Sequence, residues 1–311
     1  QLSGDFGYQF NHREEWSAFH THYDTQVMPA KDPDRELVFK LHTFSSSLKL
    51  RLFNSSSWEH MAGWNMQIQK NAIGGYSFLL PEYKRFITGA FWLTTFRLDN
   101  QLSVTGGIRY DRGRIDITAF EDPYLVEYLH RQGYEEEVIQ AYRWRSYPVD
   151  RAYGNYSCSA GVVWTPAAGH LLKMNVGRSF RLPGGNELAS NGVHHGTFRH
   201  EKGDATLSSE QGWQIDASYT LAYKKMELVV SSFASWFDNY IYLRPMGEWS
   251  VLPHAGQIYQ YSGARALFMG GEINFNMDFL RHFNYRLVGE YVYTYNRDEH
   301  TALSFSPPVS M

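Results

Sequence analysis

The chain has 311 residues, a formal net charge of −3 and a pI near 6.5, so it lacks the basic character of a nucleic-acid-binding protein. Its mean hydropathy is −0.44, and no run approaches the ~18 apolar residues of a membrane-spanning helix. Cys158 is the single cysteine, which excludes a disulfide framework. Aromatic residues make up an unusual 16% of the chain.

Apolar and polar side chains alternate along most of the chain, which is the pattern of β-strands with one face in contact with water. In the second strand the apolar phase switches between Phe39 and Leu48, which predicts a β-bulge near Ser45 to Ser47. The predicted strands, about eleven, cover residues 2–10, 36–53, 58–68, 84–98, 102–111, 156–164, 172–177, 213–221, 226–243, 261–277 and 283–296.

The connections between these strands alternate between short turns and long loops. Turns are predicted near residues 54, 99, 167, 224 and 280, and loops of roughly a dozen to thirty residues lie between them. The longest irregular segment is 120–151. There Asp122-Pro123 is a helix-start signal, and Gly133 predicts a break between two short helices.

The long loops all lie on one side of the predicted sheet, and the strands are much longer than the ~5–6 residues most common in globular sheets. Together these features predict an all-β fold, an antiparallel up-and-down transmembrane β-barrel. Aromatic side chains at strand ends suit the interfacial girdles of such a barrel. A propeller would repeat about every 40 residues, and a sandwich would have shorter strands without loop asymmetry. The residues expected to face outward are Leu102, Val104, Ile108, Trp213, Ile215, Tyr285 and Leu287.

Charged residues on the strands are expected to face the barrel lumen, because an Arg at the lipid midplane costs ~2–4 kcal/mol. In the lumen they would contact water and a plug domain rather than substrate. These residues are Arg109, Asp111, Glu272, Arg286 and Glu290.

Residues 175–210 carry the most distinctive motifs, on a long polar loop between two alternating strands. The segment contains Gly177-Arg-Ser-Phe-Arg-Leu-Pro183, Glu187-Leu188, His194-His195 and Gly203-Asp-Ala-Thr-Leu-Ser-Ser-Glu210. It resembles the late-barrel signature of TonB-dependent outer-membrane receptors, roughly G-R-x-F-R-x-P, then E-L, then G-N-P-x-L-x-P-E. Asp204-Ala205 replaces the Asn-Pro of that pattern, and Ser209 replaces its second Pro.

The resemblance implies a Gram-negative outer membrane, energy from the TonB complex, and a barrel of roughly 22 strands filled by an N-terminal plug. Residues 1–311 would then be the C-terminal part of the barrel, with the plug, the signal peptide and the TonB-contacting segment absent. Both chain ends look like cuts. The chain alone is expected to form an open, curved sheet whose exposed edges favour aggregation.

Histidine is frequent in the predicted extracellular loops, where eight of the thirteen lie. With the nearby carboxylates of Asp24, Glu201 and Asp204 they suit capture of Zn²⁺, Cu²⁺ or haem iron. The alternative is that they are solvated loop residues or a pH-sensitive surface. The eight are His20, His22, His130, His194, His195, His200, His254 and His300.

The predicted function is uptake of a scarce nutrient, most simply a metal ion or metal complex: zinc, copper, haem or a ferric siderophore. The cargo itself is left open, cobalamin and glycans included, and no resident cofactor is required. An outer-membrane β-barrel enzyme or a passive porin-like channel is the rival reading, although no Ser-His-Asp grouping or phosphate-binding glycine loop stands out. The predicted metal ligands are His20, His22, His194, His195 and His200, and the predicted ligand-binding set is His194, His195, His200, Glu201 and His254.

Overall fold

The fold is dominated by one large, mainly antiparallel sheet, seen in a computed structural model that describes residues 1–21, 23–52, 55–194, 197–253, 255–279 and 282–303. The sheet has thirteen strands, and without the short β10 and β11 eleven long strands are left, as predicted. They are β1 (Leu2–Trp16), β2 (Arg35–Leu52), β3 (Trp58–Gly74), β4 (Tyr83–Arg97), β5 (Leu102–Ile117), β8 (Val149–Trp164), β9 (His170–Arg181), β12 (Glu210–Tyr223), β13 (Met226–Trp249), β14 (Gln257–Phe279) and β15 (Phe283–Asn296).

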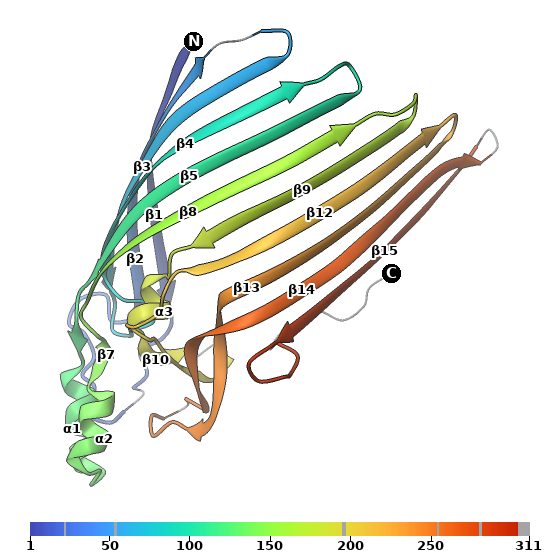
Figure 1. Ribbon diagram of the computed structural model, residues 1–311. Coiled ribbons are helices and arrows are strands. Elements are labelled where there is room, and N and C mark those ends of the chain that lie inside the picture. The colour runs from blue at the N-terminus through green and yellow to red at the C-terminus, as the bar shows by residue number, and fades with distance from the viewer. Residues whose placement is uncertain (22, 53–54, 195–196, 254, 280–281, 304–311) are drawn as a thin grey trace.

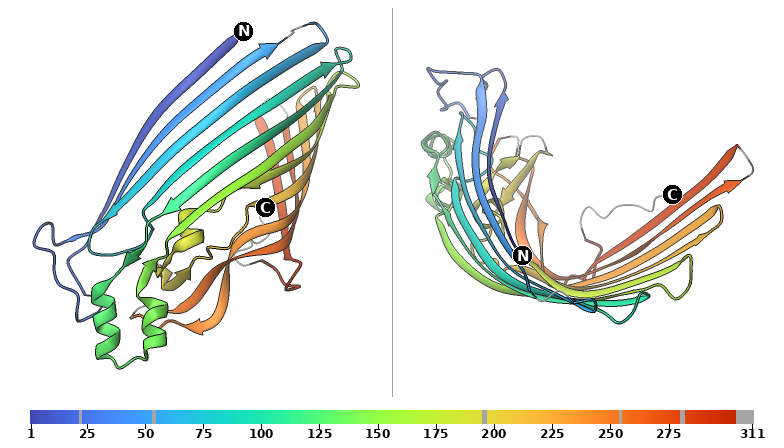
Figure 2. Two further views of the ribbon diagram at one scale, coloured as in Figure 1. Left: turned by 60° about the vertical axis from the view of Figure 1, so that its left-hand side comes forward. Right: turned by 90° about the horizontal axis from the view of Figure 1, so that it is seen from above.

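The long strands pair with their neighbours in chain order, so the topology is up-and-down. Figure 1 shows them side by side from β1 to β15. Viewed from above, the sheet curves into a trough that stays open between these two edge strands (Figure 2). The prediction of an antiparallel, partial barrel is therefore confirmed.

Short turns lie at one end of the trough and long loops at the other (Figure 1). In the turn between β4 and β5, the Asp99 carboxylate accepts hydrogen bonds from the backbone N–H groups of Gln101 and Leu102, at 2.7 and 2.8 Å. At the turn between β12 and β13, Lys224 adopts a positive φ of 51°. The alternation of connection lengths seen in the sequence thus separates the two ends of the fold.

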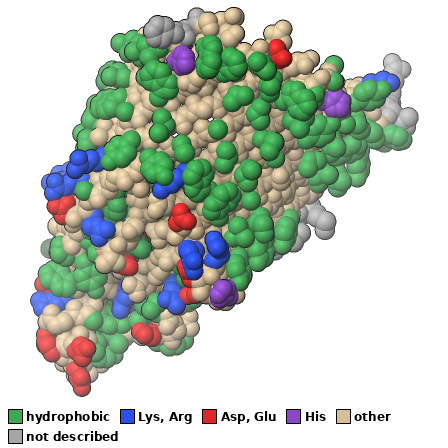
Figure 3. All heavy atoms as spheres, viewed as in Figure 1, with side chains coloured by type: hydrophobic (Ala, Val, Ile, Leu, Met, Phe, Trp, Pro, Cys, Tyr) green, Lys and Arg blue, Asp and Glu red, His purple; other side chains and the backbone are tan. Residues whose placement is uncertain are grey.

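The convex face of the trough is apolar, as predicted. Ile108 is 60% exposed, and Tyr285 is 51% exposed, although both are large hydrophobic residues. Figure 3 shows hydrophobic side chains spread across this face. The other residues predicted to face outward are exposed or half-exposed: Leu102, Val104, Trp213, Ile215 and Leu287.

Polar and charged side chains line the concave face. Arg109 donates from Nε to Asp111 Oδ2 at 2.6 Å and from Nη1 to Asn65 Oδ1, on β3, at 2.7 Å. Asp111 is buried in this network, 3% exposed. Glu272 and Glu290 face each other across β14 and β15 and line the trough. Because side chains alternate along a strand, apolar residues outside leave the polar ones inside.

The predicted bulge at Ser45 to Ser47 was wrong. β2 pairs with β1 and with β3 in unbroken register through these residues. The apolar side chains of β2 switch from the inward to the outward face because the surroundings of the two faces differ along this regular strand. Leu37 and Phe39 face the trough near the long loops and are each 7% exposed, whereas Leu48 faces outward and is 37% exposed.

Helices occur where the sequence predicted them, in the loop between β5 and β8. α1 (Pro123–Arg131) begins at Asp122, whose side chain accepts from the backbone N–H groups of Tyr124 and Leu125. Gly133, at φ 77°, separates it from α2 (Glu136–Tyr142). Within the described residues, no helix is both long and apolar enough to cross a membrane. The short strands β6 (Phe120–Glu121) and β7 (Trp144–Ser146) pair at the base of this loop.

Candidate ligand site at the long-loop end

The loop that joins β9 to β12 folds back into the trough instead of projecting from it. It contains α3 (Gly185–Ala189), β10 (Asn191–His194) and β11 (Arg199–Lys202). Leu188 is fully buried and Leu207 is 5% exposed. Both pack in one cluster with inward-facing residues of the wall: Ile115, Ile117, Val149, Tyr153 and Ile241. Burial of these side chains stabilises the folded loop by about 1.5–3 kcal/mol each.

The charged residues of the motif segment hold the two ends of this loop together. Arg181 pairs with Glu187 at 2.8 Å and with Glu210 at 3.1 Å. Glu187 also accepts from the backbone N–H of Gly184 at 2.6 Å, and Glu210 accepts from that of Ile241 at 2.9 Å. The pairs therefore tie the end of β9 and the start of β12 to α3 and to β13.

β11 adds to the sheet in an arrangement that the sequence did not predict. It pairs with β10 and runs parallel to β14, with Arg199 opposite Gln257 and Lys202 opposite Gln260. β13 is also longer than predicted, because it continues with register shifts to Trp249. These additions extend the sheet toward the long-loop end and give the loops a framework.

His200, on β11, is fully buried and has a partner at each ring nitrogen. Nε2 lies 2.8 Å from Asn191 Oδ1, and Nδ1 lies 2.7 Å from Ser250 Oγ. The amide nitrogen of Asn191 donates to Ala141 and Trp144 carbonyls, so its oxygen faces the imidazole and Nε2 carries the proton. Burial, together with the charges of Arg145 and Lys202, lowers the His200 pKa to about 3.

This neutral imidazole makes the β10–β11 hairpin sensitive to acid. In the unfolded loop His200 takes up a proton near pH 6.5, whereas in the folded loop it resists protonation down to about pH 3. The unfolded loop therefore binds more protons in this window, and the stability of the hairpin falls as the pH falls. Hydrogen exchange of residues 191–202, corrected for intrinsic rates, is expected to show up to about fifteenfold more frequent opening at pH 5 than at pH 6.5.

A His200→Gln variant should abolish this pH response, and His130→Gln, on exposed α1, should keep it. Equal opening of the wild-type hairpin at both pH values would contradict the expectation.

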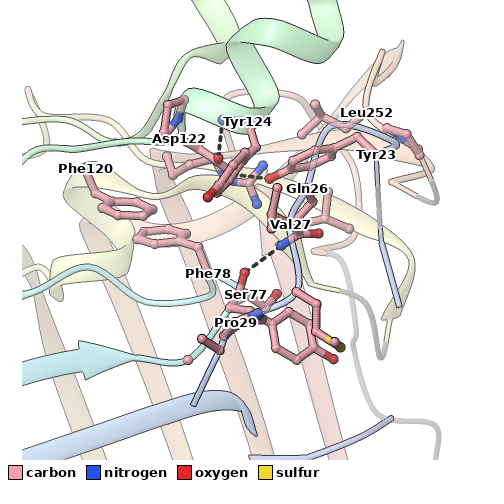
Figure 4. A pocket seen from close by; sticks show the side chains of 18 residues that line it. Tyr23, Gln26, Val27, Pro29, Ser77, Phe78, Phe120, Asp122, Tyr124 and Leu252 are labelled. Atoms are coloured by element: carbon pink, nitrogen blue, oxygen red, sulfur yellow. Dashed lines mark hydrogen bonds between the residues drawn. The ribbon is translucent and has the colours of Figure 1, made fainter. Parts of the chain in front are cut away.

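A cavity of about 630 Å³ lies among the long loops. Its walls come from the β1–β2 loop, the β3–β4 loop, the segments that flank α1 and α2, β10 and the β13–β14 loop. Figure 4 shows the side chains that line it. The lining is mainly aromatic and apolar: Tyr23, Val27, Met28, Pro29, Tyr76, Phe78, Phe120, Tyr124, Val193 and Leu252.

Hydrogen bonds between loops fix the shape of this cavity. Gln26 donates to the Tyr76 carbonyl at 2.8 Å, which joins the first loop to the second. Phe78 stacks on Phe120 with ring centroids 5.3 Å apart (Figure 4). The Tyr23 hydroxyl donates to Asp122 (Figure 4). Burial, with a smaller contribution from the Asp122 charge, raises the Tyr23 pKa, so the phenol keeps its proton at neutral pH.

Arg145, on β7, brings a buried positive charge to the cavity wall. It is 5% exposed, and its Nε has no hydrogen-bond partner in the described part of the chain. The guanidinium lies over the ring of Phe78, 5.8 Å from its centroid. Asp122 also lines the cavity, but among the described residues its carboxylate forms no ion pair with Arg145; it accepts hydrogen bonds from Tyr23 and from the first turn of α1. Because a buried charge without a counterion is unfavourable, this cation favours an anionic group in the cavity.

The structure places the residues of the predicted metal site at different points of the long-loop end. His20 is exposed, and its Nδ1 lies 3.0 Å from the Ala18 carbonyl. His194 is the last residue of β10. Glu201, on β11, accepts from the Tyr261 hydroxyl at 3.1 Å. The other predicted ligands lie outside the described residues: His22, His195 and His254.

Among the described residues, no group of three or more His, Cys, Asp or Glu is arranged to hold a metal ion. The histidine site therefore stays a prediction. Arg145 and the aromatic residues around it were not predicted. Arg145 lies in a segment that was predicted to be irregular and belongs to no motif, so only the packed loops reveal its burial.

The family model described as "TonB dependent receptor-like, beta-barrel" matches residues 1–310 of the chain. No curated protein matches it in sequence.

Among solved structures, the copper transporter OprC superposes with a TM-score of 0.73 at 14% identity, over 99% of this chain and 46% of OprC. The Serratia marcescens hemophore receptor HasR, solved with its hemophore HasA and heme, gives 0.58 at 19% identity over 84% of this chain and 42% of its own. The siderophore receptor PirA from Pseudomonas aeruginosa gives 0.55 at 15% identity over 83% and 41%. These likenesses show the fold, and the chain spans less than half the length of each relative.

Proposed function

The chain belongs to the TonB-dependent receptor β-barrel family, whose proteins are outer-membrane β-barrels, and from this premise we propose that it forms part of an active-transport receptor. The cargo is a metal ion or metal complex, taken up with energy from the TonB complex. The long loops are its extracellular side. The copper, haem and siderophore receptors that share the fold support this choice of substrate class.

The observation that carries the proposal is the loop cavity with Arg145 in its wall. An aromatic lining binds flat or apolar organic groups, and one buried guanidinium selects for a negative charge. A metal held in an anionic organic complex, such as a ferric catecholate or haem with its carboxylates, combines both features. A hydrated metal cation has neither, and its capture would depend on the predicted histidines instead.

Replacing Arg145 with methionine tests this site, because methionine keeps most of the side-chain volume and removes the charge. Calorimetry on the full-length receptor would compare a ferric tris-catecholate, haemin and a neutral ferric trihydroxamate. We expect at least one anionic complex to bind, and its affinity to fall about ten- to a hundredfold in Arg145→Met, since hydrogen bonds to charged groups contribute about 1.5–3 kcal/mol. The neutral complex should bind weakly to both proteins.

Arg131→Met is the matched control, because Arg131 is exposed on α1 and pairs with Glu127 across the helix surface. It should leave affinity unchanged. Equal affinity of the wild type and Arg145→Met for every anionic complex would contradict the cavity assignment.

Titration with CuCl₂ and ZnCl₂, with and without His194→Ala, tests the histidine prediction. If cells lacking TonB still take up the metal complex, the alternative hypothesis of a passive porin-like channel would be favoured.

A further inference from the structure

A further cavity, of about 330 Å³, lies beside the loop cavity, and we call it the second cavity. Its walls come from the inward-folded loop, the β3–β4 loop, β13 and β14. Gly192 lines it and stands next to the loop cavity, because a Cβ there would lie 3.2 Å from Arg145 Nη2 and 3.4 Å from Phe78 Cδ1. The two cavities therefore share a thin wall, but they have different linings.

Ser190, directly after α3, brings an unpaired hydroxyl group to the second cavity. The residue is 3% exposed, and its Oγ has no hydrogen-bond partner in the part of the chain that the structure describes. Its backbone groups are paired, since its N–H donates to the Asn186 carbonyl and its carbonyl accepts from Gly203. Buried polar groups are nearly always hydrogen-bonded, so this hydroxyl in a cavity wall points to a ligand with a polar group.

Arg199 and Glu201 bring one charge of each sign to the same cavity. They are two residues apart on β11, so their side chains lie on one face of the strand. Arg199 Nη2 lies 3.9 Å from Glu201 Oε1, which is beyond hydrogen-bonding distance. Among the described residues of the lining no other side chain is charged, so the net charge is zero. A ligand with one positive and one negative group complements such a wall.

A chain of hydrogen bonds holds the Glu201 carboxylate in place. Asn186 Nδ2 donates to the Tyr261 hydroxyl at 3.0 Å, and this hydroxyl donates to Glu201 Oε2 at 3.1 Å. Asn186 lies on α3 and Tyr261 on β14, so the carboxylate is fixed between the inward-folded loop and the wall. An acceptor that is already oriented favours a cationic donor such as an ammonium group.

Aliphatic side chains complete the lining. Leu79 and Leu80 come from the β3–β4 loop, and Leu243 comes from β13. An aliphatic surface beside two opposite charges suits a small zwitterion with an aliphatic side chain. The volume is near the lower limit of ligand pockets, about 300–1,000 Å³, so the ligand is small.

We infer that the second cavity binds a free aliphatic α-amino acid in its zwitterionic form. The ammonium group contacts Glu201, and the carboxylate contacts Arg199 and the Ser190 hydroxyl. The aliphatic side chain packs against the three leucines. The inference is independent of the metal cargo, because the residues that line the second cavity and those that line the loop cavity form separate sets.

Calorimetry on the full-length receptor tests the ligand class with L-leucine, 4-methylpentanoate and 3-methylbutylamine. The two analogues keep the aliphatic chain of leucine, but each has only one of its charged groups. We expect L-leucine to bind about tenfold or more tightly than either analogue, because each analogue leaves one charged side chain of the cavity without its partner. Absence of L-leucine binding at millimolar concentration, or equal affinity for 4-methylpentanoate, would overturn the inference.

Ser190→Ala separates ligand binding from a structural role. The affinity for L-leucine should fall about three- to tenfold, because one hydrogen bond to the ligand is lost. Thermal stability without ligand should stay the same or rise, since the Ser190 hydroxyl has no partner among the described residues. Ser208→Ala is the matched control, because Ser208 is exposed in the same loop and lies outside the lining. Equal affinity of Ser190→Ala and the wild type for L-leucine would contradict the site.

Glu201→Gln tests the contact with the ammonium group. It should weaken L-leucine about tenfold and leave the affinity for 4-methylpentanoate unchanged, whereas a merely structural role of Glu201 would weaken both. Saturating L-leucine should also leave the affinity for the anionic metal complexes unchanged. Competition between them would contradict the presence of two separate sites, and failure of either ligand class alone leaves the other proposal standing.

Discussion

Replacing Gly203 with alanine is expected to release the inward-folded loop from the wall of the trough. A Cβ at this position would lie 2.5 Å from the backbone nitrogen of Ala189 and 2.7 Å from the carbonyl carbon of Leu188. Both are backbone atoms at the end of α3, so no side-chain rotation relieves the contact. The hydrogen bonds from Gly203 N–H to Ser190 O and from Asp204 N–H to Glu187 O would break as the segments separate.

Overpacking typically costs about 1–3 kcal/mol and more where the backbone must move. Hydrogen exchange of residues 185–204 in the full-length receptor is expected to accelerate by about ten- to a hundredfold. Gly106→Ala is the control, because a Cβ there makes an ordinary contact of 3.7 Å with Ser159 O. Unchanged protection of the loop in Gly203→Ala would show that α3 does not rest on this glycine.

Replacing Arg181 with methionine is expected to loosen the same loop at its other end. Glu187 and Glu210 are then left without their shared cation, although their side chains are only 13% and 14% exposed. Removing one partner of a buried ion pair costs about 3–5 kcal/mol. Arg181 itself is 44% exposed, so solvent compensates part of the loss, and about 1–3 kcal/mol is the expected destabilisation.

Thermal unfolding of the full-length receptor, with hydrogen exchange of residues 182–209, measures this effect. Adding Glu187→Gln and Glu210→Gln to Arg181→Met should recover part of the lost stability, because the two uncompensated charges disappear. A triple variant no more stable than Arg181→Met would mean that the packing of the arginine stem, and not its charge, holds the loop.

The strands of this protein could be predicted from sequence because their signal is local. On the convex face Ile108 and Tyr285 follow a period of two, and on the concave face Arg109 and Asp111 occupy the alternate positions. The same locality explains the error at Ser45 to Ser47. A change of apolar phase was interpreted as a bulge, whereas it records the burial of Leu37 and Phe39 at the long-loop end of a regular strand.

The sequence by itself determined the up-and-down sheet, its short and long ends, the helix start at Asp122 and the family motifs of residues 175–210. Only the tertiary structure decided what the motifs do, because Arg181 meets Glu210 and β11 meets β14 across long chain separations. It also decided the chemistry of the candidate site. His200 was conspicuous in the sequence, but in the structure it is buried and hydrogen-bonded. Arg145 was inconspicuous in the sequence, but it lines the cavity. The reason is that burial depends on how separate loops pack, and no local pattern encodes that packing.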